Sequence, residues 1–81
     1  MKKPIHIYGL STCPWCRKTK ALFTKSGAPF DYVDYDLADE PTQAKIMAEL
    51  DAAGANGFPF VKVGADIVIG YQPERFAQLL A

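Results

Sequence analysis

The chain is poor in the residue types that build metal centres and highly charged binding surfaces. Among its 81 residues are only two cysteines, one histidine and one tryptophan. A closed structural zinc site needs four ligands, so these residues do not complete one within a single chain. Lys plus Arg and Asp plus Glu each total 9, which gives a formal net charge of zero. We therefore expect no binding to nucleic acid or membrane surfaces through bulk charge.

Long hydrophobic runs are also missing. No apolar segment approaches the roughly 20 residues that a membrane-spanning helix needs. The apolar stretch behind residues 1–4 is interrupted by His6 and Ser11, unlike the core of a secretory signal. We therefore expect a cytoplasmic protein. Its hydrophobic fraction of 49% and aromatic fraction of 12% are typical of a folded globule. Its length fits a single domain over residues 1–81, and we expect this domain to be a monomer.

Hydrophobic patterning predicts seven elements in the order strand, helix, strand, helix, strand, strand, helix. Strands are expected at 5–9, 30–35, 60–63 and 66–69, where β-branched or aromatic residues cluster. Helices are expected at 14–26, from 39–41 to about 51, and from 73 or 74 onward. A helical crossover makes the first two strands parallel, and Gly64-Ala65 joins the last two as a hairpin. The fold class is therefore α/β, with a four-stranded mixed sheet and helices on both faces.

The first helix has a predicted apolar face and a predicted end. Trp15, Ala21, Leu22 and Phe23 are expected to lie on one apolar stripe. Gly27 is expected to end the helix in the left-handed conformation that glycine adopts readily. This helix follows the first strand so closely that the loop between them is short.

The two cysteines carry the strongest functional signal. Cys13 and Cys16 lie three residues apart, where the first strand gives way to the first helix. A sulfur at a helix N-terminus lies near unpaired backbone N–H groups and the positive end of the helix dipole, which favour the reactive thiolate. Pro14 suits the first helical turn, because its missing N–H costs nothing there. The pattern favours a redox-active dithiol. An inert small-loop disulfide and a metal or iron–sulfur cluster held by Cys13 in a dimer remain open.

Two segments and the element order carry a family resemblance. Cys13-Pro14-Trp15-Cys16 and Phe58-Pro59, in a chain with this order of elements, resemble the minimal thioredoxin fold of the glutaredoxin family. Residues 70–74 are similar to the C-terminal segment of NrdH-type redoxins. The resemblance covers nearly the whole chain. It implies a thiol–disulfide oxidoreductase in which Cys13 attacks a disulfide and Cys16 resolves the mixed disulfide.

The resemblance also suggests which residues bind substrate. It implies a cis peptide bond before Pro59, with the Phe58 backbone free to pair with an extended substrate. Trp15 is expected to present a flat apolar surface beside the sulfur, although a half-buried core position is the alternative. Tyr8 is a further candidate to line this groove, or to serve in packing alone, and His6 is expected to be a sheet residue remote from the thiols. The substrate-binding candidates are Pro14, Trp15, Phe58, Pro59 and Tyr71.

The implied partners are disulfide-bearing proteins and a reductant, which is either glutathione or a thioredoxin reductase. No other cofactor and no bound metal are expected. The lysine that glutaredoxins carry shortly before the first cysteine is absent from residues 10–12, and the family's Gly-Gly…Asp segment is replaced by residues 69–74. Both changes remove partners for the charged ends of glutathione and favour a protein reductase. Arg17, Lys18 and Gln43 are candidates to compensate.

Overall fold

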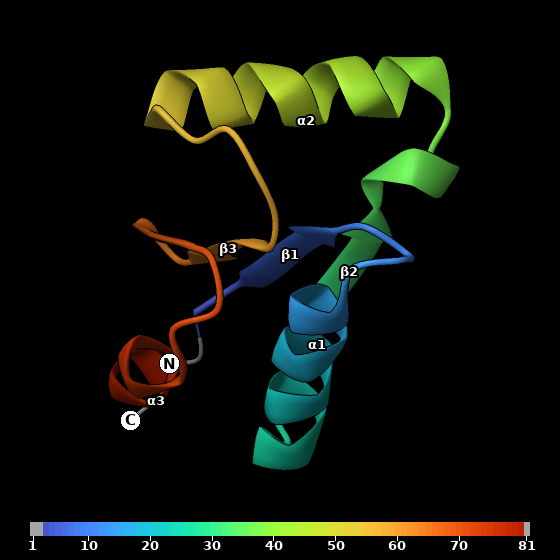
Figure 1. Ribbon diagram of the computed structural model, residues 1–81. Helices are drawn as coiled ribbons and strands as arrows, with labels where there is room; N and C mark the ends of the chain where they lie inside the picture. Colours follow the sequence, from blue (N-terminus) through green and yellow to red (C-terminus); the bar gives the residue numbers. More distant parts are fainter. Residues whose placement is uncertain (1–2, 81) are drawn as a thin grey trace.

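The computed structural model describes residues 3–80 and confirms the predicted α/β architecture (Figure 1). Its elements are β1 (Ile5–Gly9), α1 (Pro14–Ser26), β2 (Asp31–Asp34), the short 3-10 helix η1 (Tyr35–Leu37), α2 (Glu40–Ala53), β3 (Phe60–Val63), β4 (Asp66–Ile69) and α3 (Pro73–Leu80). The four strands form one sheet in the order β2-β1-β3-β4. β1 runs parallel to β2 and antiparallel to β3, and β3 and β4 form the predicted hairpin.

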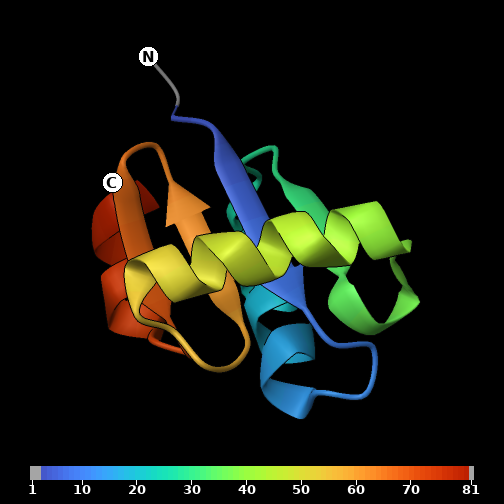
Figure 2. The ribbon, with the colours of Figure 1, turned by 90° about the horizontal axis from the view of Figure 1, so that it is seen from above.

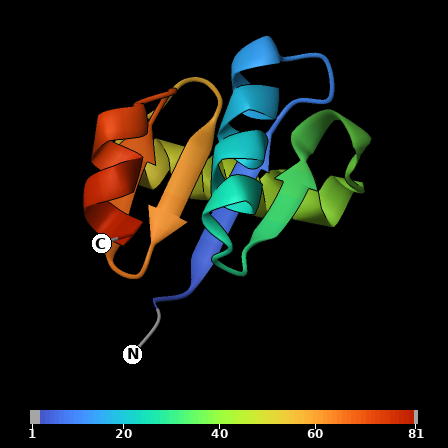
Figure 3. The same ribbon diagram turned by 90° about the horizontal axis from the view of Figure 1, so that it is seen from below.

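Helices cover both faces of the sheet. α2 crosses one face (Figure 2), and α1 and α3 cover the other (Figure 3). The core beneath α1 and α3 consists of Ile5, Ile7, Phe23, Val61, Val63, Val68 and Phe76. The core beneath α2 consists of Tyr8, Ile46, Leu50, Ala55 and Phe60. Because successive strand residues point to opposite faces, the central strands supply both cores.

α1 buries a different stripe from the predicted one. Phe23 is buried, but Trp15 and Ala21 are exposed. The buried residues of the helix are Cys16, Thr19 and Phe23, which recur at the spacing of one helical face. Thr19 tolerates full burial because its hydroxyl donates a hydrogen bond to the Trp15 carbonyl at 2.8 Å. The helix therefore turns its second cysteine toward the sheet and its tryptophan toward solvent.

The second strand is shorter than predicted. The pattern indicated residues 30–35, whereas β2 spans Asp31–Asp34 and Tyr35 begins η1. The Tyr35 carbonyl accepts hydrogen bonds from the Ala38 N–H at 3.2 Å and from the Gln43 side chain at 2.8 Å. These contacts bend the chain out of the sheet toward α2, and aromatic enrichment alone does not reveal them.

The predicted end of α1 and the predicted start of α2 are confirmed, whereas α2 runs to Ala53 and not to about residue 51. α1 ends at Gly27, whose φ of 78° is left-handed. Asp39 precedes α2 and accepts a hydrogen bond from the Thr42 N–H at 2.9 Å, which satisfies one of the free donors of the first turn. Local sequence is sufficient for these features because each cap involves residues close together in the chain.

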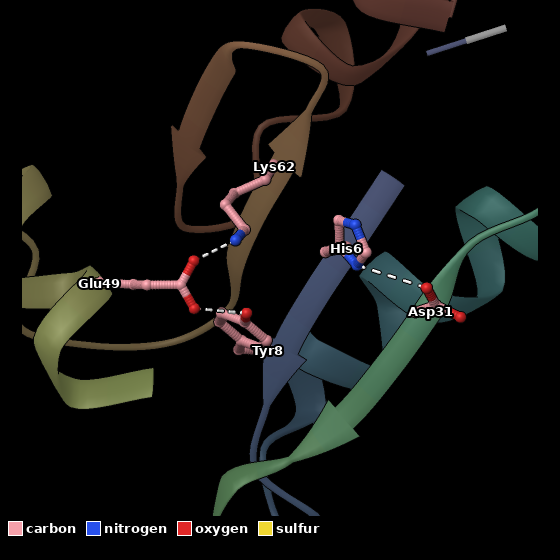
Figure 4. A network of polar contacts seen from close by, with 5 residues as sticks. All are labelled: His6, Tyr8, Asp31, Glu49 and Lys62. Atoms are coloured by element: carbon pink, nitrogen blue, oxygen red, sulfur yellow. Dashed lines mark hydrogen bonds and ion pairs between the residues drawn. The ribbon is translucent and has the colours of Figure 1, made fainter. Parts of the chain in front are cut away.

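A polar network ties α2 to the central strands (Figure 4). The Tyr8 hydroxyl donates to Glu49 Oε2 at 2.5 Å, and Lys62 Nζ donates to the other carboxylate oxygen. His6 Nδ1 lies 3.4 Å from Asp31 Oδ2 on the neighbouring strand. His6 is a sheet residue, as predicted, and it lies near the start of β1, whereas the cysteines follow the end of that strand. The suggestion that Tyr8 lines a groove beside the cysteines is wrong, because its side chain packs under α2.

The Glu49 carboxylate gives stability a defined pH dependence. Partial burial opposes its ionisation, but hydrogen bonds from Lys62 and Tyr8 and the lysine charge outweigh that effect and lower the pKa of Glu49 below 4.5. A carboxylate with a lowered folded-state pKa stabilises the fold above its unfolded pKa and loses that contribution as pH falls through the folded value.

We expect Glu49→Gln to destabilise the protein by about 1–3 kcal/mol at neutral pH. The difference between the two proteins should shrink as pH falls below 4.5, the ordinary value for this group. Urea unfolding of both proteins over a pH series measures this difference in the free energy of unfolding. A gap that stays constant down to the acid limit of folding would show that Glu49 is not the responsible group.

Candidate active site

Cys13 occupies the N-cap of α1. Its backbone is extended, with φ −89° and ψ 116°, and its Sγ accepts a hydrogen bond from the Cys16 N–H at 3.3 Å. Pro14 follows as the first residue of the helix. This geometry aims the sulfur at the free N–H groups of the first turn, as the sequence predicted. Donors of this kind favour a negatively charged sulfur.

Cys16 lies one helical turn deeper and is fully buried. Burial, followed by its hydrogen bond with Cys13, raises the pKa of the Cys16 thiol to about 12. Cys16 is therefore a protonated thiol at neutral pH. Both cysteines are free, and Cys13 is the one that is partly exposed. The two sulfurs thus differ sharply in their access to solvent and to an incoming disulfide.

A shallow groove of about 240 Å³ lies next to the cysteine segment. It is lined by Trp15, Phe58, Pro59, Gly70 and Tyr71. The Phe58–Pro59 peptide bond is cis, as the resemblance implied. The structure therefore brings four of the five predicted substrate-binding residues onto one surface, although they come from three separate parts of the chain.

The exposed wall of this groove is anchored to the core. Trp15 is 52% exposed, and its ring lies 5.5 Å from that of Tyr71, centroid to centroid. Tyr71 in turn meets the buried Phe76 ring edge to face at 6.2 Å, and Lys18 Nζ lies 4.5 Å from the Trp15 centroid. An exposed aromatic held in this way offers apolar area to a partner. Pro14, the fifth candidate, is exposed at the start of α1, outside this groove.

The loop before Cys13 is held by a residue that the sequence analysis missed. Asp36 of η1 accepts hydrogen bonds from the Ser11 N–H at 2.9 Å and from the Ser11 hydroxyl. The hydrogen bond from the Ser11 hydroxyl, followed by the one from the Ser11 N–H, lowers the pKa of the Asp36 carboxyl. Arg17 donates to the Ser11 carbonyl at 3.2 Å, and the Cys13 N–H donates to the Leu10 carbonyl at 3.1 Å. Ser11 and Asp36 are 25 residues apart, so no local pattern pointed to the pair.

Two kinds of feature are absent from the part of the chain that the structure describes. Among residues 3–80, no three His, Cys, Asp or Glu side chains gather closely enough to hold a metal ion. Over the same range, each helix is too short or too polar to cross a membrane.

Comparison with known proteins places the chain in a family. The Glutaredoxin family profile matches residues 5–68, a range that includes both cysteines and the Phe58-Pro59 pair. The chain belongs to the glutaredoxin family. It is also similar to an uncharacterized glutaredoxin-like 8.6 kDa protein in the rubredoxin operon of Clostridium pasteurianum, with 30% identity over 76 residues that cover 94% of this chain and 96% of the other.

Solved structures agree with this assignment. Methanoredoxin from Methanosarcina acetivorans has a TM-score of 0.92 at 30% identity, with coverage of 99% of this chain and 86% of that one. NrdH-redoxin from Escherichia coli, a glutaredoxin-like protein with a thioredoxin-like activity profile, has a TM-score of 0.79 at 25% identity, with coverage of 94% and 93%. The chain is thus a member of a family of redox proteins, and it contains the Cys13 and Cys16 pair in mutual contact.

Proposed function

We propose that this protein is a dithiol–disulfide oxidoreductase that reduces disulfides in other proteins. The observation that carries the proposal is the contact between a partly exposed Cys13 at a helix N-cap and a buried Cys16 one turn deeper. Cys13 thiolate attacks one sulfur of a substrate disulfide, forms a mixed disulfide and releases the other sulfur as thiolate. Cys16 then loses its proton and attacks Cys13 Sγ, which releases the second substrate sulfur. A reductant returns the resulting Cys13–Cys16 disulfide to the dithiol.

The groove supports a protein substrate. Its lining of Trp15, Phe58 and Tyr71 supplies apolar area next to the nucleophile, and an extended peptide can pair with the Phe58 backbone by strand addition. We further propose that the protein acts as a monomer in the cytoplasm, a compartment whose reductants keep such dithiols reduced.

For the electron donor we propose a protein reductase in preference to glutathione. Ser11, two residues before the nucleophile, is bound by the Asp36 carboxylate, an anion that repels a glutathione carboxylate. The three candidates to compensate for the missing lysine are engaged elsewhere: Arg17 with the Ser11 carbonyl, Lys18 over Trp15 and Gln43 with the Tyr35 carbonyl. The likeness to NrdH-redoxin, whose activity profile is thioredoxin-like, supports the same choice.

Two coupled assays with insulin as the disulfide substrate test the function and the donor together. Both follow NADPH oxidation, one through glutathione and glutathione reductase and the other through thioredoxin reductase. We expect the protein reductase to be the better donor by a factor of about ten or more, because one missing charge-assisted hydrogen bond weakens binding by about 1.5–3 kcal/mol.

The alternative outcomes are distinct. Saturation at low glutathione with no reaction through thioredoxin reductase would reverse the donor assignment. Absence of turnover in both assays would overturn the proposal that the protein is a dithiol–disulfide oxidoreductase. The iron content and visible absorbance of freshly purified protein would then test the cluster-bound dimer.

A further inference from the structure

The groups packed around Cys16 determine where its proton goes when it attacks Cys13. Cys16 is fully buried, and burial, with the Cys13 hydrogen bond, raises the pKa of its thiol to about 12. The resolving thiolate is therefore scarce at neutral pH. A proton acceptor beside Cys16 would let the sulfur lose its proton as it attacks.

Cys16 packs against β1 at Gly9. A Cβ placed on Gly9 would lie 3.0 Å from the Cys16 Cβ and 2.5 Å from the Tyr32 hydroxyl oxygen. Both groups therefore lie over this glycine, which leaves no room for a side chain there. In the parallel pairing of β1 with β2, the register partner of Gly9 is Asp34.

Strand geometry places Asp34 on the same side of the sheet. Tyr32 and Asp34 are two residues apart on β2, so their side chains share one face. Tyr32 packs against the core beneath α1 and α3, whereas Val33, between them, packs against the core beneath α2. The Asp34 carboxylate thus lies on the α1 face, beside the glycine against which Cys16 rests.

The electrostatics of this cluster link the same groups. Burial and then the nearby Asp34 side chain raise the pKa of the Tyr32 hydroxyl. The Asp34 charge is the smallest of the effects that raise the pKa of Cys16, after burial, the Cys13 hydrogen bond and the Cys13 charge. From α1, Lys20 Nζ lies 4.8 Å from the Tyr32 ring centroid. A carboxylate that lies within reach of a thiol, directly or through one water, can accept the thiol's proton.

We propose that Asp34 accepts the proton of Cys16 in the resolving step and that Tyr32 positions the carboxylate. The proposal rests on the proposed function, in which Cys16 resolves. The Cys16 S–H bond breaks and its proton passes to Asp34, directly or through one water. The sulfur's electron pair forms the bond to Cys13 Sγ, and the bond between Cys13 and the substrate sulfur breaks. The substrate leaves as thiolate and takes up a proton, which Asp34 returns through solvent.

A two-phase reaction tests the proposal. The reduced protein is mixed with equimolar 5,5′-dithiobis(2-nitrobenzoate), and release of the coloured thiolate is followed by stopped flow. Cys13 releases the first equivalent and Cys16 the second. We expect Asp34→Asn to slow the second phase about 10²-fold at neutral pH, within the range of general-base effects. Its first phase should match that of the unsubstituted protein.

The pH profile separates a proton acceptor from a structural role. In Asp34→Asn the second phase should depend on hydroxide and rise about tenfold per pH unit, more steeply than in the unsubstituted protein. Tyr32→Phe, which keeps the ring, should slow the second phase about three- to tenfold. Asp31→Asn, at the exposed start of β2, is the matched control and should alter neither phase.

The contrary results point to different errors. An Asp34→Asn second phase with unchanged rate and slope would overturn the role of Asp34. If that variant fails to fold, an unchanged second phase in Tyr32→Phe would overturn the proposal. A reaction of the unsubstituted protein that stops after one equivalent would instead overturn resolution by Cys16, and with it the proposed function.

Discussion

Cys13→Ser is expected to lose disulfide reduction, whereas Cys16→Ser is expected to attack disulfides normally and then stop at the mixed disulfide. The reason is the difference in access between the two sulfurs. Cys13 is partly exposed, and its Sγ accepts a hydrogen bond from the Cys16 N–H at 3.3 Å, while Cys16 is fully buried. Removing the attacking group should lower turnover about 10³-fold or more, as loss of a nucleophile does in other enzymes.

Intact mass after exposure to a disulfide substrate distinguishes the two variants. Cys16→Ser should gain the mass of one substrate chain, and Cys13→Ser should gain none. Thr12→Ser, a change at the exposed neighbour of the nucleophile, controls for disturbance of the loop and should retain turnover. If Cys13→Ser kept full turnover while Cys16→Ser no longer attacked disulfides, the two roles would be reversed.

Phe23→Ala is expected to remove a large part of the stability of the domain. Phe23 is fully buried, and its ring lies 5.2 Å from that of Phe76 and 6.0 Å from that of Phe30. Truncating a buried phenylalanine costs about 3–5 kcal/mol. A domain of 81 residues has a total stability of only about 4–12 kcal/mol. The midpoint of thermal unfolding should fall by roughly 12–40 °C.

Circular dichroism during heating and urea titration measures this loss. Leu37→Ala is the matched control, because Leu37 is 73% exposed and its truncation should change stability by less than about 0.5 kcal/mol. A loss of the same small size in Phe23→Ala would show that α1 is not fixed to the sheet by this side chain. Since Cys16 lies on the same buried face of α1, loss of the Phe23 ring in Phe23→Ala should also make the Cys16 thiol more accessible to alkylation.

The sequence by itself determined the features that depend on neighbouring residues. The cysteine spacing, the proline at the start of α1 and the left-handed Gly27 at its end are local, and the structure has each of them. The four strands were also recoverable, because β-branched and aromatic runs separated by turn residues mark them. The family resemblance rested on equally short segments and is confirmed over residues 5–68.

Only the tertiary structure decided which side chains meet. An apolar stripe containing Trp15 suited α1 as an isolated helix. The sheet instead receives Cys16, and the Trp15 ring packs at a tilt against the Tyr71 ring at the groove. The contacts around the cysteines join positions that only the fold brings together: Ser11 with Asp36 in the loop before α1, and Asp34 with Gly9 through the register of two strands. Helical and strand periodicities specify which face a residue occupies within its own element. They do not specify the neighbouring element or its register, which packing of the whole chain fixes.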